Sequence, residues 1–556
     1  MQEISKLIHK VVLELFHEQV DIELTRTDEQ FGDYATNIAL RLSKIVGQNP
    51  RDVAQKIVEN TKSALIENAE VAGPGFINLT LTNEALWEIA DQEPAKTLEG
   101  KVVLAEYSDP NPLKPLHAGH LYTTLVGDTI SHLLENAGAK TTRINYGGDV
   151  GLHVGKSMWA IIKYLNGEFP EKLTEVPEAE RPTWLGERYV EGNNAYEDNE
   201  AAKQEIIATN KRVYQVHAED DHASPFAEIY WTVRQWSYDY FHVLYDQLQV
   251  KPFDRFLPES EVTPLGLKTV REQLKKGIYK ESNGAVVFEG EPYGLHTRVF
   301  INSEGLPTYE AKDVGLLLTK WQDYHYDKSY YITAHEQAQY FQVMFKSVEQ
   351  FLPEAVKGTV SMTHGLVKLQ GGVKMSSRKG NIVSALEILD AARAAGKESG
   401  TSPSDETVLA AVKYAFAKNR IGSDIAYNPK ESIALEGNSG PYLQYAHARA
   451  SSILQKSSVS NSNPQSDTME LDLGERTLLR KIGEYAEVVE RATAELMPHH
   501  ICTYLYELAQ AFNRFYEVSR VIDDPRESTR IPLVSKYAAT LKNGLNLLGI
   551  HAPEKM

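Results

Sequence analysis

Cysteine is almost absent from this chain of 556 residues, since Cys502 is its one cysteine. A single thiol cannot form an intrachain disulfide or build a zinc site from several thiolates. Long hydrophobic runs are lacking too, because no apolar stretch reaches the roughly 18 residues that a membrane span needs. The N-terminal stretch 1–18 carries Glu3, Glu14 and Glu18 and has no apolar signal-peptide core. We therefore expect a cytoplasmic protein without a membrane segment and without zinc.

Positive charge is also scarce. The chain has 58 Lys and Arg residues against 76 Asp and Glu residues, which gives a net charge of −18 at pH 7. Such a chain is a poor non-specific binder of polyanions, so a nucleic-acid partner would need local basic patches. The 42% hydrophobic and 24% charged residues are ordinary for a globular protein, and the length suggests three or four domains.

Two short motifs carry most of the information about function. Residues His117–His120 read His-Ala-Gly-His, and residues 374–378, far downstream, read Lys-Met-Ser-Ser-Arg. Either motif alone is equally well explained by surface histidines or a solvated basic loop, because short motifs often match by chance. Their joint presence in this order favours a site that handles a nucleoside triphosphate.

The first motif lies between a predicted strand at 102–107 and a predicted helix at 121–134. We expect this turn to present unpaired backbone N–H groups and the positive end of the helix dipole to a phosphate. Gly119 lets the backbone approach the ligand, because glycine has no Cβ. His117 and His120 are expected to donate hydrogen bonds to phosphoryl oxygens as charge develops in the transition state.

The second motif is expected to supply mobile charge for a leaving pyrophosphate. Lys374 is followed by Met375, Ser376 and Ser377 on a loop rich in serine and glycine. Lys114, just before the first motif, offers a second ammonium group. Both lysines are therefore candidates for the role facing the pyrophosphate.

Hydrophobic periodicity predicts four parts, with an α+β unit first. Residues 1–93 show helical patterns that lead into an alternating strand. From 94 to about 365, strands alternate with helices, the pattern of a parallel α/β sheet. Charged helical sequence at about 165–245 carries no strand signal and is expected to be an insertion. Further strands of this part are predicted at 142–146, 285–288 and 330–333.

The remainder of the chain is predicted to be almost wholly helical. A loop-bearing region at 366–435 precedes a helical region at 436–556, and a polar loop is expected at 457–466. In the last region Tyr442, Tyr445 and Arg449 are spaced i, i+3 and i+7, which places them on one helical stripe. Such planar side chains can stack unpaired RNA bases, although a stripe of this kind is more often part of a core.

The two motifs together resemble the signature of class I aminoacyl-tRNA synthetases, whose catalytic domain is a Rossmann-like parallel sheet. Residues 108–115 (Ser-Asp-Pro-Asn-Pro-Leu-Lys-Pro), 437–449 (Gly-Asn-Ser-Gly-Pro-Tyr-Leu-Gln-Tyr-Ala-His-Ala-Arg) and 552–556 (Ala-Pro-Glu-Lys-Met) narrow the resemblance to the arginyl-tRNA synthetases. Residues 31–34 (Phe-Gly-Asp-Tyr) and 73–78 (Gly-Pro-Gly-Phe-Ile-Asn) resemble the additional N-terminal domain of that family. The likeness touches every part of the chain and is weakest in the insertion.

The resemblance implies that L-arginine is activated by ATP, supplied with Mg²⁺, and transferred to the 3′ end of tRNA(Arg). It makes 1–93 an additional tRNA-binding domain, 94–365 the catalytic domain, 366–435 a region that contacts the tRNA stem and 436–556 an all-α anticodon-binding bundle. Many family members lack the lysine that opens the second motif and use the one before the first, whereas this chain has both. We expect the protein to act as a monomer.

An arginine site is also readable from residue chemistry. A guanidinium is a planar cation that carboxylates hold best in bidentate geometry. Tyr309 and Asp313 are spaced i, i+4 at the start of a predicted helix, so they share one face. The resemblance assigns both to arginine, together with Asn111, Glu259 and Gln337. Any one of these is more often a helix cap or a solvated charge, but their joint match favours a binding site.

The resemblance also implies contacts for ATP and tRNA. It makes Gly365, Leu366 and Val367 a strand end that contacts adenine, although a core strand explains these residues as well. The residues that it assigns to tRNA are Phe76 and Asn78 at the elbow loop, and Tyr442, Tyr445, Arg449 and Met556 at the anticodon loop.

Three alternatives stay open. A nucleotidylyltransferase also uses His-x-Gly-His, but it is much shorter and lacks the helical C-terminal region. A synthetase-like RNA-binding regulatory protein would have lost catalytic residues, whereas His117, His120 and Lys374 are intact. Class I synthetases for methionine, cysteine, isoleucine and leucine commonly carry cysteine-bound zinc, which one cysteine cannot build.

Overall fold

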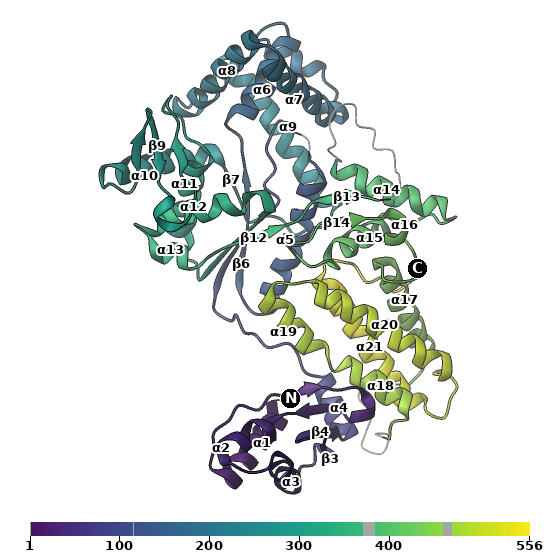
Figure 1. The fold of residues 1–556 in the computed structure, drawn as a ribbon. Coiled ribbons are helices and arrows are strands. Elements are labelled where there is room, and N and C mark those ends of the chain that lie inside the picture. The colour runs from purple at the N-terminus through teal and green to yellow at the C-terminus, as the bar shows by residue number, and fades with distance from the viewer. Residues whose placement is uncertain (1, 115, 371–383, 460–469) are drawn as a thin grey trace.

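The N-terminal unit of the protein is a four-stranded antiparallel sheet covered by helices. The computed structural model (Figure 1) describes residues 2–114, 116–370, 384–459 and 470–556. The strand order of this first sheet is β1-β2-β4-β3. Its elements are α1 (Gln2–Phe16), β1 (Thr25–Arg26), η1 (Glu29–Phe31), β2 (Tyr34–Thr36), α2 (Ile38–Val46), α3 (Pro50–Asn60), β3 (Ile66–Ala72), β4 (Phe76–Leu81) and α4 (Asn83–Ala90).

The centre of the molecule is a five-stranded parallel sheet in the order β12-β11-β5-β6-β7. Its strands are β5 (Val102–Glu106), β6 (Lys140–Gly147), β7 (Arg255–Pro258), β11 (Lys328–Ala334) and β12 (Thr359–His364). From β5 the chain adds β6 and β7 on one side, and later adds β11 and β12 on the other. Ligands of such sheets bind beyond the carboxyl ends of the strands at this change of direction.

Helices connect the parallel strands. They are α5 (Ala118–Asn136), α6 (Leu152–Tyr164), α10 (Glu259–Lys275), α11 (Tyr309–Tyr324), η5 (His335–Gln337), α12 (Ala338–Glu349) and α13 (Pro353–Lys357). Residues 165–245 contain helical elements and no strand, as the sequence predicted. These elements are η2 (Pro170–Glu175), η3 (Glu178–Glu180), α7 (Arg181–Asp198), α8 (Glu200–Ala218) and α9 (Pro225–Gln247), and they form the top of the molecule in Figure 1.

The strand predicted at 285–288 exists, but its expected place in the parallel sheet is wrong. This strand, β9 (Ala285–Phe288), pairs antiparallel with β8 (Lys280–Ser282) and β10 (Arg298–Ile301) in a separate sheet. The reason is the Asn283-Gly284 turn between β8 and β9, where both residues have positive φ, 50° and 77°. Two such residues make the tight turn that folds a strand back on its neighbour. The remaining short element before α11 is η4 (Glu291–Tyr293).

The C-terminal part is mainly helical, as predicted, with one short addition. The strand β13 (Val367–Leu369) pairs in parallel with β14 (Ile425–Tyr427). The helices are α14 (Ala385–Glu398), α15 (Asp405–Ala417), α16 (Pro429–Ser432), α17 (Gly440–Lys456), α18 (Leu473–Ile482), α19 (Tyr485–Glu495), α20 (His499–Val518) and α21 (Glu527–Leu547). None of the helices in the described parts of the chain is long and apolar enough to cross a membrane.

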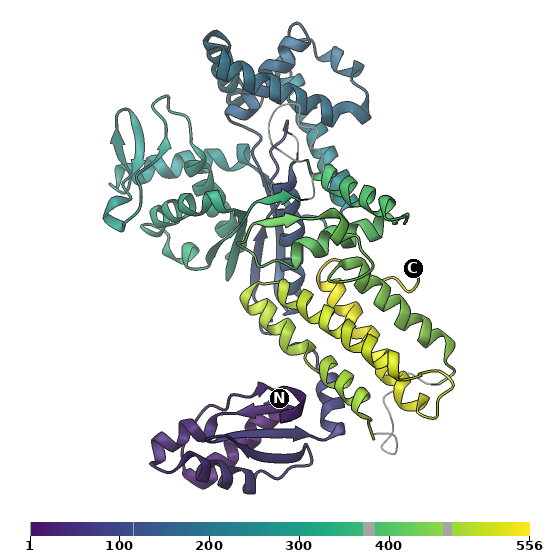
Figure 2. The ribbon, with the colours of Figure 1, turned by 45° about the vertical axis from the view of Figure 1, so that its right-hand side comes forward.

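One hydrophobic core joins the two ends of the chain. Ile8 and Leu86 of the N-terminal unit belong to the same buried cluster as Leu478 and Phe512 of the C-terminal helices. Figures 1 and 2 both show the N-terminal unit against these helices and away from the insertion. The two terminal parts therefore pack as neighbours, while the parallel sheet stands apart from the N-terminal unit.

Candidate active site

A cavity of about 860 Å³ opens at the carboxyl ends of the parallel strands. Each strand contributes to its lining at or just after its last residue, for example Glu106 of β5, Glu259 after β7 and His364 of β12. The strand ends meet there because all five strands are parallel. The cavity thus lies where an open parallel sheet is expected to bind its ligand.

The cavity brings together the candidate residues of the catalytic part that the structure describes. Those that line it are Asn111, Lys114, His117, Gly119, His120, Glu259, Tyr309, Asp313, Gln337, Gly365, Leu366 and Val367. Lys374, Met375, Ser376 and Ser377 lie outside the described residues.

His117 is the N-cap of α5 and forms a reciprocal capping box with His120. Its Nδ1 accepts the backbone N–H groups of Gly119 at 3.1 Å and of His120 at 3.4 Å. The expectation that these N–H groups are unpaired is therefore wrong for this structure, because the histidine ring occupies the place of an anion. The gap between Gly119 and the ring is small: an added Cβ on Gly119 would lie 3.0 Å from the imidazole of His117.

The two imidazoles are arranged as neutral donors. The Nδ1 of His120 accepts the backbone N–H of His117 at 3.3 Å, so both Nδ1 atoms act as acceptors. The proton of each neutral ring is then on Nε2, which remains able to donate. Burial and the positive charge of Lys114 lower the pKa of His117 to about 4, and burial lowers the pKa of His120 as well. Both rings are therefore uncharged at neutral pH.

Lys114 lines the cavity beside the helical insertion. Its ammonium stands 5.3 Å from the ring centroid of Tyr189 on α7. Burial, together with repulsion from Lys156, lowers the pKa of Lys114. A negatively charged phosphate would relieve both costs, which makes this lysine a suitable partner for one.

The cavity lining also includes several acidic side chains. Asp313 is 7% exposed and accepts a hydrogen bond from the hydroxyl of Tyr340. Burial raises the pKa of Asp313 to about 8, with added repulsion from Glu106 and Glu259. A cation placed against this carboxyl would favour its ionised form. Tyr309 begins α11, Asp313 follows it at i+4, and both line the cavity, so the predicted shared face is present.

Glu259 differs from Asp313 because it already has a cation. Its carboxylate pairs with the ammonium of Lys312 at 2.6 Å, and both side chains are at least 95% buried. Burial raises the pKa of Glu259, and Lys312 opposes that shift. On the cavity side, a Cβ added at Gly148 would lie 2.5 Å from Asn111 Oδ1 and 3.2 Å from the carboxyl carbon of Glu259. Glycine at 148 thus leaves the space between the two candidate arginine ligands open.

Close packing of two helices aligns these carboxylates. Glu259 begins α10 and Asp313 lies near the start of α11. Gly266 of α10 and Gly315 of α11 lie at their contact: an added Cβ would stand 1.9 Å from Ala311 O and 2.1 Å from Val262 O, respectively. Any side chain at either position would push the helices apart.

The sequence missed several residues of this cavity. Arg298 reaches it from β10, donates to Glu310 at 3.1 Å and lies 5.6 Å from the ring centroid of Tyr340. The sequence around Arg298 contains no recognisable motif. This residue lies in the separate antiparallel sheet, so its place in the cavity depends on tertiary packing. Tyr340 follows Gln337 by one helical turn, and that spacing was a usable signal. Among the residues that the structure describes, no group of three or more histidine, cysteine or acidic side chains is arranged to hold a metal ion.

Comparison with known proteins decides the family. The catalytic domain described as "tRNA synthetases class I (R)" matches residues 83–424, more than half of the chain. The chain belongs to the arginyl-tRNA synthetase family. The family's N-terminal domain matches residues 2–81, and the DALR anticodon binding domain matches residues 443–556. The reaction of arginyl-tRNA synthetases is the ATP-dependent charging of tRNA(Arg) with arginine, so the chain is an enzyme of the ligase type.

Relatives match along nearly the whole chain. An arginine–tRNA ligase of Cutibacterium acnes is 31% identical over 557 residues, covering 95% of this chain and 96% of the relative. One of Porphyromonas gingivalis is 29% identical over 580 residues, covering 96% of each. The solved structure of Thermus thermophilus arginyl-tRNA synthetase superposes with a TM-score of 0.80 at 24% identity, covering all of both chains. The predicted architecture, a Rossmann-like catalytic part with a helical insertion between an α+β unit and a helical bundle, is confirmed.

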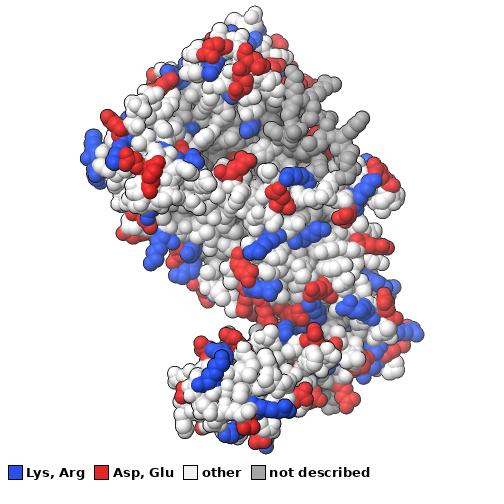
Figure 3. Space-filling view, in the orientation of Figure 1, with Lys and Arg blue, Asp and Glu red and all other residues white. Residues whose placement is uncertain are grey.

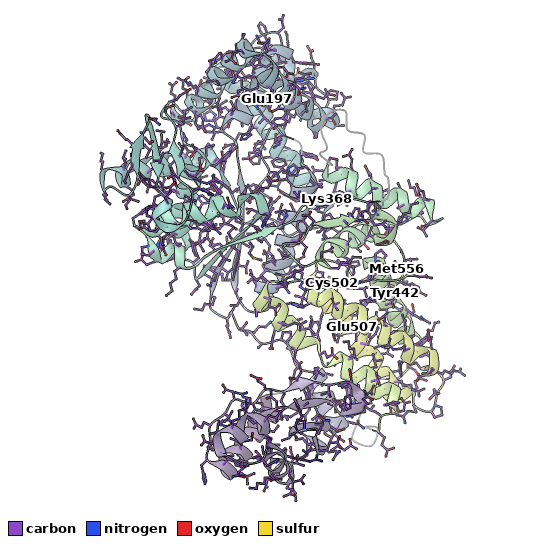
Figure 4. All side chains as sticks on the ribbon, in the orientation of Figure 1. Glu197, Lys368, Tyr442, Cys502, Glu507 and Met556 are labelled. Carbon is purple, nitrogen blue, oxygen red and sulfur yellow. The ribbon has the colours of Figure 1, made fainter. Side chains whose placement is uncertain are left out.

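The candidate anticodon residues of this synthetase are only partly exposed. The hydroxyl of Tyr442 accepts a hydrogen bond from the side chain of Asn513 on α20 at 2.8 Å. The guanidinium of Arg449 lies 4.5 Å from the ring centroid of Tyr516, which is also on α20. Tyr445 is 45% exposed and Met556 is 55% exposed. Tyr442 and Met556 lie on the same side of the C-terminal helices (Figure 4). The stripe is therefore half-buried at Tyr442 and Arg449 and exposed at Tyr445.

The candidate elbow residues differ in the same way. Phe76 begins β4 and is 42% exposed, whereas Asn78 is 7% exposed and sits opposite Ala35 and Glu70 in the sheet. Phe76 thus offers the larger surface. Figure 3 shows basic and acidic side chains interspersed over the face in view, across both the catalytic and the C-terminal parts.

The Phe-Gly-Asp-Tyr segment has a structural role inside this synthetase. Asp33 is 2% exposed and pairs with Arg476 at 2.6 Å and Arg480 at 3.1 Å on α18. The hydroxyl of Tyr34 donates to Glu487 on α19 at 3.1 Å. These contacts fasten the N-terminal unit to the C-terminal helices.

Proposed function

We propose that L-arginine reacts with ATP in the 860 Å³ cavity and that the arginyl group then passes to the 3′ end of tRNA(Arg). One observation carries this assignment. The same cavity is lined both by a buried carboxyl that needs a cation, Asp313, and by the neutral imidazoles of His117 and His120. This arrangement fits a substrate that is cationic at one end and reacts with a phosphoryl group at the other.

In this proposal Asp313 and Glu259 receive the guanidinium, and Tyr309, Gln337 and Asn111 orient the rest of the amino acid. Their shared lining of the cavity supports the assignment. The arginine carboxylate attacks the α-phosphorus of ATP, the bond to the β-phosphate oxygen breaks, and pyrophosphate leaves with Mg²⁺. The arginyl-adenylate then esterifies the 2′-hydroxyl of the terminal adenosine, and AMP departs. Positioning and charge stabilisation supply the rate, without a covalent enzyme intermediate.

The nucleotide roles follow the same division. The Nε2–H groups of His117 and His120 donate to phosphoryl oxygens, and Gly119 admits the triphosphate. Gly365, Leu366 and Val367 contact the adenine, which their place in the cavity lining supports. Lys374, with Met375, Ser376 and Ser377, shares the pyrophosphate with Lys114. An antiparallel β-bridge joins His117 to Ser384, which follows the second motif in the sequence. This contact supports the sharing of the pyrophosphate.

For tRNA, we infer that residues 1–93 contact the elbow through Phe76 and Asn78, and that residues 366–435 contact the stem. Residues 436–556 take the anticodon loop through Tyr442, Tyr445, Arg449 and Met556. The exposure of Phe76, Tyr445 and Met556 supports these roles. We also propose that the enzyme is a monomer, acts in the cytoplasm and binds no zinc. Sedimentation tests the first point, cell fractionation the second and metal analysis the third.

The deciding experiment is ATP–pyrophosphate exchange with each amino acid in turn, with and without tRNA(Arg). We expect exchange with arginine alone among the amino acids, stimulated by tRNA. Exchange with another amino acid, or none under any condition, would overturn the proposal and favour the regulatory RNA-binding alternative or a different specificity.

A further inference from the structure

The ion pair between Lys312 and Glu259 sits directly behind the proposed arginine site. Glu259 lines the cavity, whereas the ammonium of Lys312 lies behind it and also donates to the carbonyl of Val150 at 3.3 Å. Tyr309 and Tyr214 flank the ammonium, with ring centroids 5.2 Å and 5.8 Å away. Lys312 is thus enclosed by protein and directed at one carboxylate.

The two acidic residues assigned to the guanidinium are therefore not equivalent. Glu259 has a buried cation at 2.6 Å, whereas Asp313 accepts a hydrogen bond from the neutral hydroxyl of Tyr340. A guanidinium carries one positive charge, so it can balance one additional carboxylate. If both carboxylates lacked a cation, a single arginine would leave one negative charge buried without compensation, which is costly.

We propose that Lys312 is a positioning residue for amino-acid selection: it holds Glu259 ionised and directed at the cavity, and leaves Asp313 as the carboxylate that the substrate guanidinium balances. This inference rests on the proposed function, since it takes Glu259 and Asp313 as arginine ligands. Lys312 does not line the cavity, so it acts through Glu259 rather than on the substrate.

The surroundings of Glu259 give it little other charge support. The charged or titratable groups that interact with it are Lys312, Tyr309 and Asp313 on α11, Tyr214 on α8, Tyr146 on β6, Tyr340 on α12 and Asp149 after β6. His153 on α6 lies near Lys312. Asp149 is itself paired with Arg234 at 2.9 Å, and burial keeps His153 neutral by lowering its pKa to about 4. Without Lys312, burial would therefore drive Glu259 to take up a proton.

The test is calorimetric titration of the whole enzyme with L-arginine at pH 7, in two buffers of different ionisation enthalpy, which counts the protons released. The wild type should release about one proton, from Asp313. Lys312→Met should release more than the wild type, because Glu259 must also ionise, and should bind arginine at least about tenfold more weakly. ATP affinity should stay within about twofold, and Lys312→Arg should restore both quantities because it returns the cation.

A matched control is Arg530→Met. Arg530 pairs at 2.8 Å with the fully buried Glu475 in the C-terminal helices, which also pairs with Arg526, so its replacement removes a buried ion pair outside the cavity. This variant should lower the melting temperature without changing the proton count. A Lys312→Met enzyme with wild-type proton release and arginine affinity would overturn the inference. A wild type that binds no arginine would instead overturn the proposed function.

If Lys312→Met does not fold, the pair can be removed together. Lys312→Met combined with Glu259→Gln leaves no unpaired carboxylate at this position. The combined variant should release about one proton and bind arginine no more weakly than Glu259→Gln alone, because Lys312 acts through Glu259. A substantially larger loss in the combined variant would show that Lys312 acts by another route, and the inference would be wrong.

Discussion

The imidazoles of His117 and His120 stack with ring centroids 3.8 Å apart, and each Nδ1 accepts the backbone N–H of the other residue. This reciprocal arrangement uses the same two side chains to begin α5 and to line the cavity. A change at either histidine therefore affects both helix stability and chemistry, and the two effects must be separated.

Replacement of His117 or His120 by Ala should lower kcat for adenylate formation by ~10²–10³, the usual loss for one preorganised donor. His117→Ala should also lose about 1 kcal/mol of stability with its cap, whereas His117→Asn should restore the cap but not the rate. Single-turnover kinetics with thermal unfolding of the three variants separates the effects. Unchanged single-turnover rates in both Ala variants would remove the histidines from the chemistry.

Lys114 and Lys374 are expected to act as one unit on the pyrophosphate. If they do, replacing both by Ala should lose less rate than the product of the two single losses, since groups that act together are not additive. Pyrophosphate exchange on the three variants measures this. A silent Lys114→Ala beside a severe Lys374→Ala would mean that Lys374 acts alone.

Asp313→Asn should weaken arginine binding by ~2–5 kcal/mol, the usual cost of removing one partner of a buried charge pair. ATP binding should change little, because the proposal gives Asp313 a contact with the amino acid alone. Calorimetric titration with each ligand makes the comparison. Equal losses for arginine and ATP would exclude a specific contact with the guanidinium.

Asp313 should also make the stability of the free enzyme depend on pH. Its pKa rises from 3.8 to about 8 on folding, so between these values the folded chain holds a proton that the unfolded chain releases. The unfolding free energy of the wild type therefore falls as pH rises through this window, by up to about 1.4 kcal/mol per pH unit from this group. Asp313→Asn lacks this loss, so its stability relative to the wild type should grow from pH 4 to pH 8 and then level off. Denaturant unfolding without arginine, at pH 5, 7 and 9, checks it; a constant difference would contradict it.

Tyr445→Ala and Phe76→Ala should each cost ~1–3 kcal/mol of tRNA affinity, the usual value of one stacking contact. Because the chain carries a net charge of −18, the dependence of binding on salt should be shallower than for a basic protein of this size. Binding titrations over a range of salt concentrations test both points. Tyr442→Ala shows the effect of a structural loss in the same helix: it should lower the melting temperature of the enzyme, since Tyr442 contacts α20. Near-wild-type tRNA affinity in Tyr445→Ala would show that the stripe does not contact the RNA.

Local sequence predicted the elements around the first motif well. Periodicity and the glycine turn correctly placed three elements: the strand that ends at Glu106, the helix that begins at Ala118 and the parallel strand that ends at Gly147. These features depend on backbone propensity and on burial of one face, which neighbouring residues decide. The strand at 285–288 was assigned to the wrong sheet, although the Asn283-Gly284 signal was present, because alternation reports a strand but not its partner.

The sequence by itself determined the residue types of the site and their order along the chain, since the two histidines, the two lysines and the acidic residues are readable as chemistry. Tertiary structure decided how they are used. It paired Glu259 with Lys312 and left Asp313 against Tyr340, and it turned Asp33 and Tyr34 toward the C-terminal helices. Those outcomes depend on the contact of α10 with α11 and on a core shared by both chain ends. Burial and pairing of a charge are properties of the space around it, and residues distant in the sequence create that space.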